Sequence, residues 1–226
     1  MITEEMVFSK DAINIFTDAS ILKMPQGKFL GCPGFAVVNQ DTVLEYGWQI
    51  LGDTTSNNSE IKAVRMGVLA AAKYQNYKYI RLFSDSQLCI FGLRDRIYNW
   101  VKKIHDGQLC GYDGNPIKNQ EIFLEIAYLI VQNQIRVEFF HQRGHISLAS
   151  GEALQKAKDA FIQFNNLQCD VDMNLIARLS YYNNMVDDFT RQELSKHHIV
   201  PMTDSYQFKY KPFDINGYYN LTHNIK

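Results

Sequence analysis

The sequence predicts an α/β fold in which a mixed five-stranded sheet is flanked by helices. Three strand-like segments follow one another near the start of the chain, and two further strands alternate with helix-like segments. Consecutive strands are typical of an antiparallel meander, whereas strands separated by helices are typical of parallel pairing. The chain has 226 residues, of which 46% are hydrophobic, so it can bury one large core and carry an appendage.

The three antiparallel strands are expected at residues 12–17, 35–38 and 42–50. Their composition favours β structure, and the turn-forming Asn39-Gln40-Asp41 separates the second strand from the third. Two prolines and three glycines lie within residues 21–34, which predicts turns between the first and second strands.

The rest of the chain alternates between helix and strand. Apolar residues at helical spacing predict helices at residues 59–74, 117–131, 150–165 and 172–191. A β-prone composition predicts the fourth and fifth strands at residues 79–84 and 136–140.

The elements divide the chain into a domain and an extension. We place the domain at residues 1–191, with a helical insertion at 148–182 beside the site, and the C-terminal extension at 192–226. The extension contains two prolines and the alternating aromatic residues Tyr206, Phe208 and Tyr210. We expect an extended segment that either docks a protein partner or lies along the domain.

Composition excludes several classes of protein. The 23 Lys and Arg residues nearly balance the 24 Asp and Glu residues, and the net charge of -1 excludes a strongly basic protein that binds nucleic acid through bulk charge. No apolar run reaches the length of a membrane span, and acids and a lysine occupy the start of the chain, where a signal peptide needs apolar residues. We therefore expect a cytoplasmic protein that makes no membrane contact.

Three acidic residues mark the ends or beginnings of predicted elements. Asp18 follows the first strand, Asp85 follows the fourth, and Glu60 begins the helix between them. Because such positions can meet at one edge of a sheet, the three carboxylates could bind magnesium, which prefers oxygen ligands. The alternative is structural, since an Asp after a strand often forms a turn and a Glu in the first turn of a helix complements the helix dipole.

Seven short segments resemble, in order, the motifs of one known family, the type 1 ribonucleases H. They are FTDAS at 16–20, GCPG at 31–34, TTSNNSE at 54–60, SDSQ at 84–87, IYNWVKK at 97–103, RGH at 143–145 and NNMVD at 183–187. The resemblance covers residues 12–191 and implies a ribonuclease H-like fold.

The resemblance also implies an activity and its residues. Asp18, Glu60, Asp85 and Asp187 would be the ligands of two Mg²⁺ or Mn²⁺ ions, and His145 would assist proton transfer or product release. The implied reaction is hydrolysis of the RNA strand of an RNA–DNA hybrid by water, leaving a 5′ phosphate.

The residues implied to bind substrate follow from the same motifs. They are Ser20, Asn57, Asn58, Gln87, Trp100, Lys102 and Lys103. Residues 94–118 carry five basic against three acidic side chains, so phosphate contacts there predict an affinity that falls with salt. The alternatives are a solvated helix face for the two lysines and a core position for Trp100.

One departure from the family pattern leaves other functions open. Forty-two positions separate His145 from Asp187, a gap that compact relatives do not need. Asp170, Asp172 and Asp188 compete for the fourth ligand position, and we prefer Asp187 because Asn183-Asn184 precede it as in the motif. A catalytically weak nucleic-acid-binding module, or a nuclease of this fold that acts on DNA or structured RNA, is the alternative function.

Overall fold

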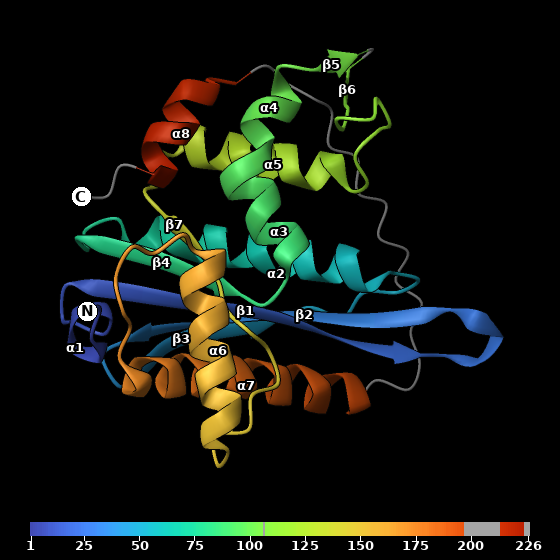
Figure 1. Ribbon diagram of the computed structural model, residues 1–226. Coiled ribbons are helices and arrows are strands. Elements are labelled where there is room, and N and C mark those ends of the chain that lie inside the picture. The colour runs from blue at the N-terminus through green and yellow to red at the C-terminus, as the bar shows by residue number, and fades with distance from the viewer. Residues whose placement is uncertain (106, 197–212, 224–226) are drawn as a thin grey trace.

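The computed structural model contains a five-stranded sheet with helices on both faces (Figure 1). It describes residues 1–105, 107–196 and 213–223. The sheet has the order β3-β2-β1-β4-β7. Its strands are β1 (Ala12–Lys23), β2 (Phe29–Asn39), β3 (Thr42–Trp48), β4 (Tyr79–Ser84) and β7 (Glu138–His141). The first three strands pair antiparallel, and β4 pairs parallel with both β1 and β7, which confirms the predicted fold class.

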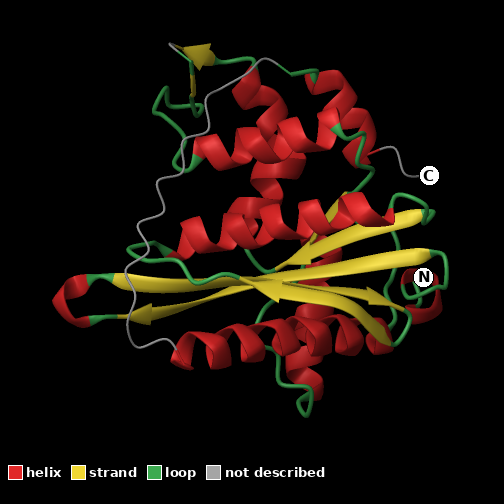
Figure 2. Cartoon of the chain, turned by 180° about the vertical axis from the view of Figure 1, so that it is seen from behind, coloured by secondary structure: helices red, strands yellow, loops and turns green. Residues whose placement is uncertain are grey.

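The helices lie in layers above and below this sheet (Figure 2). They are α1 (Glu4–Val7), α2 (Ser56–Ala71), α3 (Gln87–Phe91), α4 (Ile97–Val101), α5 (Gln120–Gln132), α6 (Gly151–Phe164), α7 (Met173–Lys196) and α8 (Ile215–His223). A π-helical turn at Gly92–Arg96 joins α3 to α4, and a short hairpin of β5 (Ile104–His105) and β6 (Gln108–Leu109) follows α4. Short 3₁₀ turns occupy Pro25–Gly27 and Ala72–Tyr74.

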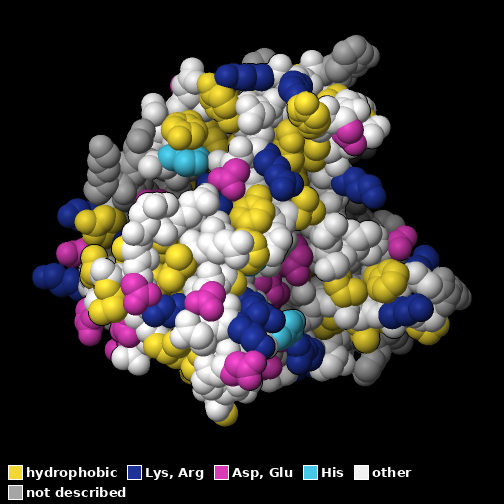
Figure 3. All heavy atoms as spheres, in the orientation of Figure 1, with side chains coloured by type: hydrophobic (Ala, Val, Ile, Leu, Met, Phe, Trp, Pro, Cys, Tyr) yellow, Lys and Arg dark blue, Asp and Glu magenta, His cyan; other side chains and the backbone are white. Residues whose placement is uncertain are grey.

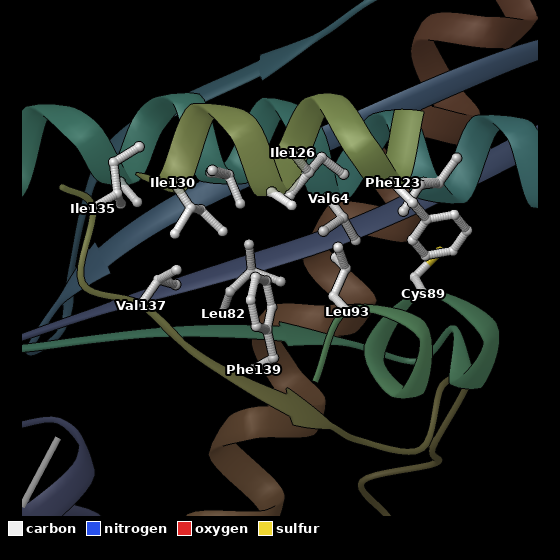
Figure 4. Packing of buried hydrophobic residues seen from close by; sticks show 14 of the residues in the cluster. Val64, Leu82, Cys89, Leu93, Phe123, Ile126, Ile130, Ile135, Val137 and Phe139 are labelled. Atoms are coloured by element: carbon white, nitrogen blue, oxygen red, sulfur yellow. The ribbon is translucent and has the colours of Figure 1, made fainter. Parts of the chain in front are cut away.

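Two hydrophobic clusters fill the two faces of the sheet. The cluster on the α2 side contains Val64 of α2, Leu82 of β4 and Phe123 of α5, which pack together between sheet and helices (Figure 4). The cluster on the α7 side contains Phe16 of β1 and Tyr182 of α7, whose stacked rings lie 5.2 Å apart. Because successive residues of a strand point to opposite faces, β1 supplies apolar side chains to both clusters.

The first hairpin is longer than the sequence predicted. Strand β1 continues past Asp18 to Lys23, and Gly31 to Gly34 lie inside β2 rather than in a turn, because Asp18 pairs with Gly34 and Lys23 pairs with Phe29. Asp18 therefore lies inside a strand and not at its end. The first strand prediction ended too early because proline and glycine at 31–34 also have the composition of a turn.

Helix boundaries also differ from the predictions. Helix α2 begins at Ser56, three residues early, because Thr55 is its N-cap and accepts a hydrogen bond from the Asn58 amide at 3.2 Å. The predicted helix at 172–191 is one unbroken helix, α7, which ends at Lys196. Residues 151–164 of the predicted insertion are helical, as expected, and the division of the chain into domain and insertion stays a prediction.

The extended conformation predicted for the C-terminal extension is wrong for residues 215–223, which form α8. Tyr218 of this helix is 1% exposed, and its hydroxyl donates a hydrogen bond to the Leu93 carbonyl oxygen at 2.7 Å. Burial of this ring against the domain outweighs the weak helical signal of a polar, tyrosine-rich segment. Tyr206, Phe208 and Tyr210 lie outside the described residues.

Among the helices of the described residues, none combines the length and apolar content that crossing a membrane requires.

Candidate active site

Three carboxylates meet beside the centre of the sheet. Oxygen atoms of Asp18, Glu60 and Asp85 all lie within 4.8 Å of one another. The parallel register pairs Thr17 of β1 with Ser84, the last residue of β4. The residues that come next in the chain, Asp18 and Asp85, therefore lie side by side. Glu60 arrives from the first turns of α2, which packs on β1 and β2.

The start of α2 is held against β2 by small side chains. Ser59 is fully buried, and its hydroxyl lies 3.4 Å from that of Thr54. A Cβ atom at Gly31 would collide with the Ser59 hydroxyl, so a glycine at 31 permits this close approach. The Thr/Ser/Asn run that precedes Glu60 therefore fixes the position at which Glu60 enters the cluster.

The cluster is electrostatically unfavourable without a cation. Burial is the main cause that raises the pKa of Asp18, Glu60 and Asp85 above their ordinary values. Repulsion adds to it, since Asp85 raises the pKa of Asp18 and Asp18 raises that of Glu60. Oxygen Oε2 of Glu60 is buried and has no hydrogen-bond partner among the residues that the structure describes. Three converging carboxylates with an unpartnered oxygen fit a hard divalent cation such as Mg²⁺ or Mn²⁺.

Asp187 lies next to this cluster, on α7. It is 8% exposed, and its charge is among the causes that raise the pKa of Asp18, Glu60 and Asp85. Its carboxylate accepts hydrogen bonds from the Ser20 hydroxyl at 3.5 Å and from the Arg191 guanidinium. Asp187 is not among the three acids whose oxygens lie within 4.8 Å of one another.

The three competing acids lie elsewhere. Asp170 pairs with Lys158 at 2.8 Å, Asp172 accepts a hydrogen bond from the Asn174 amide at 3.1 Å, and Asp188 is exposed. Asp187 is therefore the acid that the fold brings beside the cluster, and its role as a ligand stays a proposal.

His145 lies at the exposed rim of the cluster. Its Nδ1 is 3.2 Å from Oδ2 of Asp187, and its side chain is 67% exposed. The backbone of His145 is in the left-handed conformation, with φ 52°. At the end of the turn after β7, its imidazole faces Asp187 of α7.

Sequence reasoning missed three polar residues that support the acids. Asn183, 1% exposed, donates to Oδ2 of Asp18 at 3.5 Å and accepts from the Gln142 side chain at 2.6 Å. Nitrogen Nε2 of His141 lies 3.0 Å from the Asp85 backbone oxygen. Asn183 was noticed only as part of a motif, and no local pattern marks Gln142 or His141, because their contacts depend on the packing of α7 and β7.

The predicted substrate-binding residues fall into two groups. Around the acids, Ser20 contacts Asp187, Gln87 is exposed at the start of α3, Asn57 is exposed in the first turn of α2, and Asn58 donates to the Asn119 side chain at 3.1 Å. Just beyond α4, the ammonium groups of Lys102 and Lys103 lie over the rings of Tyr98 and Tyr112, 3.8 and 4.9 Å from the ring centroids.

Trp100 is mostly buried, as the structural alternative expects, and its role in substrate binding stays a prediction. It is 8% exposed, and its ring packs edge to face on Phe123 of α5 at 5.4 Å between centroids. Trp100 thus packs into the hydrophobic core, and its remaining exposed edge lines a surface pocket with Lys103.

The sheet order, the layers of helices and the buried acids together define a ribonuclease H-like domain. Residues 10–161 match the family described as RNase H, which is more than half of the chain. The chain belongs to the RNase H family, and it is an enzyme of the ribonuclease H class.

Individual relatives agree with this membership. The chain is 30% identical to the ribonuclease H of Tropheryma whipplei (strain Twist) over 148 residues, which cover 64% of this chain and 83% of the relative. The PFV RNase H domain has a similar fold, with a TM-score of 0.51 and 20% identity over 71% of this chain and 96% of that domain. A foamy viral protease-reverse transcriptase, solved in complex with RNA/DNA hybrid, matches with a TM-score of 0.50 and 16% identity over 69% of this chain and 20% of its own.

Proposed function

We propose that the protein is a metal-dependent endonuclease that hydrolyses the RNA strand of RNA–DNA hybrids and leaves a 5′ phosphate. The observation that carries the proposal is the convergence of Asp18, Glu60 and Asp85 from three different elements within 4.8 Å. Their mutual repulsion costs stability in the protein alone, so a purely structural role does not account for it.

Asp18, Glu60 and Asp85, with Asp187 beside them, would hold two Mg²⁺ or Mn²⁺ ions. Bound ions would supply a nucleophilic water at neutral pH, charge neutralisation at the phosphate and stabilisation of the leaving 3′ oxygen. The protein supplies the arrangement: Asn183 orients Asp18, and His141 supports the backbone of Asp85. These contacts keep the carboxylates in place although they repel one another.

His145 is placed to handle protons at the rim of the site. Its exposed imidazole lies 3.2 Å from Asp187, so it can exchange protons with solvent and with a leaving group. We propose that it assists the departure of the product rather than holding a metal ion.

The choice of a hybrid rests on residues around the acids. Asn57 in the first turn of α2 and Gln87, which lines a groove with Asp85, expose amide donors and acceptors that suit recognition of 2′-hydroxyl groups in a minor groove. Asn58 would join them by exchanging its bond to Asn119. Lys102 and Lys103 form an exposed basic pair that can contact phosphates of the second strand.

A cleavage assay tests this proposal. End-labelled RNA–DNA hybrid, duplex RNA and duplex DNA are incubated with the protein in magnesium, in manganese and in chelator. We expect metal-dependent cutting of the RNA strand of the hybrid alone, lost in Asp85→Asn. Asp187→Asn is compared with Asp188→Asn, which makes the same charge change on the neighbouring exposed residue and should leave cleavage intact.

The other outcomes identify the alternatives. Binding of hybrid without cutting in either metal, by a protein that melts cooperatively, would favour the nucleic-acid-binding module. Preferred cutting of duplex DNA or duplex RNA would favour a nuclease of the same fold with another substrate.

A further inference from the structure

A groove of about 600 Å³ opens beside the carboxylates, on the α6 side of the site. Its lining includes Asp85 and His145 from the site, together with Arg143, Lys156 and Gln163. A second groove of about 330 Å³ lies on the other side of His145, where Asp187 and Arg191 line it. His145 lines both grooves, so the two adjoin the site at the same residue.

Helix α6 lines the first groove, and a partly buried polar network fixes the end of this helix. Asn165, just after the helix, donates to the His141 carbonyl oxygen at 2.7 Å and accepts from the His141 amide at 2.9 Å. Arg94, which is 12% exposed at its side chain, donates to the Phe164 carbonyl at 2.8 Å and to Asn165 at 2.9 Å. Since His141 also contacts the Asp85 backbone, α6 is held at a set position relative to the acids.

The groove offers two exposed cationic side chains, one without a partner among the described residues and one in a surface ion pair. Arg143 is exposed, and within the described parts of the chain it makes no hydrogen bond or ion pair. Lys156 pairs with Glu152 one turn earlier on α6, at 2.6 Å, and both side chains are mostly exposed. Such a surface pair contributes little and is readily exchanged for another anion. Figure 3 shows Lys and Arg side chains gathered beside a histidine on the face that α6 presents.

Besides Asp85 of the carboxylate cluster, a second acid in the groove works against an anionic ligand. Asp159 of α6 lines the same groove, and its carboxylate accepts a hydrogen bond from Gln155 at 2.8 Å. Asp159 and Lys156 should therefore have opposite effects on affinity. Removal of the Asp159 charge should strengthen the binding of a polyanion, whereas removal of the Lys156 charge should weaken it.

We propose that the groove between α6 and the turn at residues 142–145 binds the phosphodiester backbone of the cut strand on one side of the scissile bond. Arg143 and Lys156 contact its phosphates, and the Gln163 amide contacts the sugar or phosphate between them. This inference rests on the proposed function, and it assigns a role in substrate binding to α6.

Binding is measured by fluorescence anisotropy of a labelled RNA–DNA hybrid in magnesium, with Asp85→Asn as the parent protein so that the probe stays intact. Lys156→Gln is expected to weaken the affinity about three- to tenfold at low salt, and to make the salt dependence shallower by about one unit of log K per log salt. Asp159→Asn is expected to tighten binding. Lys73→Gln is the matched control, because Lys73 pairs with Glu45 of β3, away from the groove, and should change neither quantity.

Shortened probes show which part of the strand uses the groove. Hybrids are trimmed from one end or from the other, and the Lys156→Gln defect should disappear with one series only. A defect that survives both series, or a variant with the affinity and salt slope of its parent, would overturn the groove proposal. If wild-type protein neither binds nor cuts any hybrid, the proposed function itself fails, so the two failures are distinguishable.

Discussion

The backbone of Gly144 lies directly against the carboxylate of Asp85. A Cβ atom on residue 144 would collide with Oδ2 of Asp85 and would lie 2.9 Å from its Cγ. A glycine is thus required in the Arg-Gly-His segment because the backbone there approaches an acidic side chain closely. The turn after β7 packs against that carboxylate. The position of Asp85 therefore depends on a residue that carries no functional group.

We predict that Gly144→Ala lowers the rate of hybrid cleavage about 100-fold or more, because a misplacement of about 1 Å at a reacting group can cost that much. The rate is measured in magnesium with saturating hybrid, and folding is checked by thermal melting. Gly151→Ala is the control, because nothing lies within 4 Å of a Cβ added there. Equal cleavage rates for the two alanine variants would contradict the importance of the contact.

We predict that Glu60, which is placed for activity, lowers the stability of the metal-free protein. Burial, with repulsion from Asp18, raises its pKa in the folded state above the unfolded value. Between these two values the folded protein binds the extra proton, so the free energy of unfolding falls as the pH rises through this range. At higher pH the folded protein must hold a buried charge whose Oε2 has no partner.

We therefore expect Glu60→Gln in chelator to raise the free energy of unfolding by about 1–2 kcal/mol at pH 8. The gain should shrink at pH 4, where wild-type Glu60 is protonated. Urea titrations at both pH values measure this, with the exposed Glu152→Gln as the reference substitution. Added magnesium should raise the melting temperature of wild type more than that of Glu60→Gln. A stability change that is the same at both pH values would show that charge burial is not its cause.

Much of the site could be predicted because its acids belong to local motifs. Asp85 directly follows a strand, and Glu60 follows a Thr/Ser/Asn run that caps a helix, so both have a signal within a few residues. Asp18 was found in the right segment, although the strand continues past it and pairs with β2. The mixed sheet followed from the order of strands and helices alone.

The supporting contacts could not be predicted in the same way. Gln142 and Asn183 are 41 positions apart and meet only because α7 packs over the sheet. Asn165 and Arg94 are 71 positions apart, and their bond depends on where α6 ends. Such pairs leave no periodic or spacing signal in the sequence. Asn, Gln and Arg are common on surfaces and in turns, so none of these residues is conspicuous by itself.

Substitution of Trp100 tests whether its side chain stabilises the core or contacts the substrate. If its ring stacked on a base, its loss would cost about 1–3 kcal/mol of binding. We expect instead that Trp100→Leu lowers the free energy of unfolding by about 2–4 kcal/mol and leaves the Michaelis constant for the hybrid nearly unchanged. Tyr112→Leu, which removes a ring that is 98% exposed, should leave stability unchanged. A large rise in the Michaelis constant for Trp100→Leu, with stability retained, would restore the substrate-binding role.

Helix α8 is predicted to be part of the folding unit. Tyr218 packs into the cluster on the α2 side, and its hydroxyl satisfies the Leu93 carbonyl in the π-helical turn that follows α3. We expect Tyr218→Ala to lower the free energy of unfolding by about 3–5 kcal/mol, and Tyr218→Phe to lower it by about 1–2 kcal/mol, the cost of a buried carbonyl without its donor. Chemical denaturation of the full chain measures both values. Tyr219→Ala, at a half-exposed neighbour on the same helix, should cost much less. If Tyr218→Ala unfolds at the wild-type midpoint, the packing of α8 does not contribute to the stability of the domain.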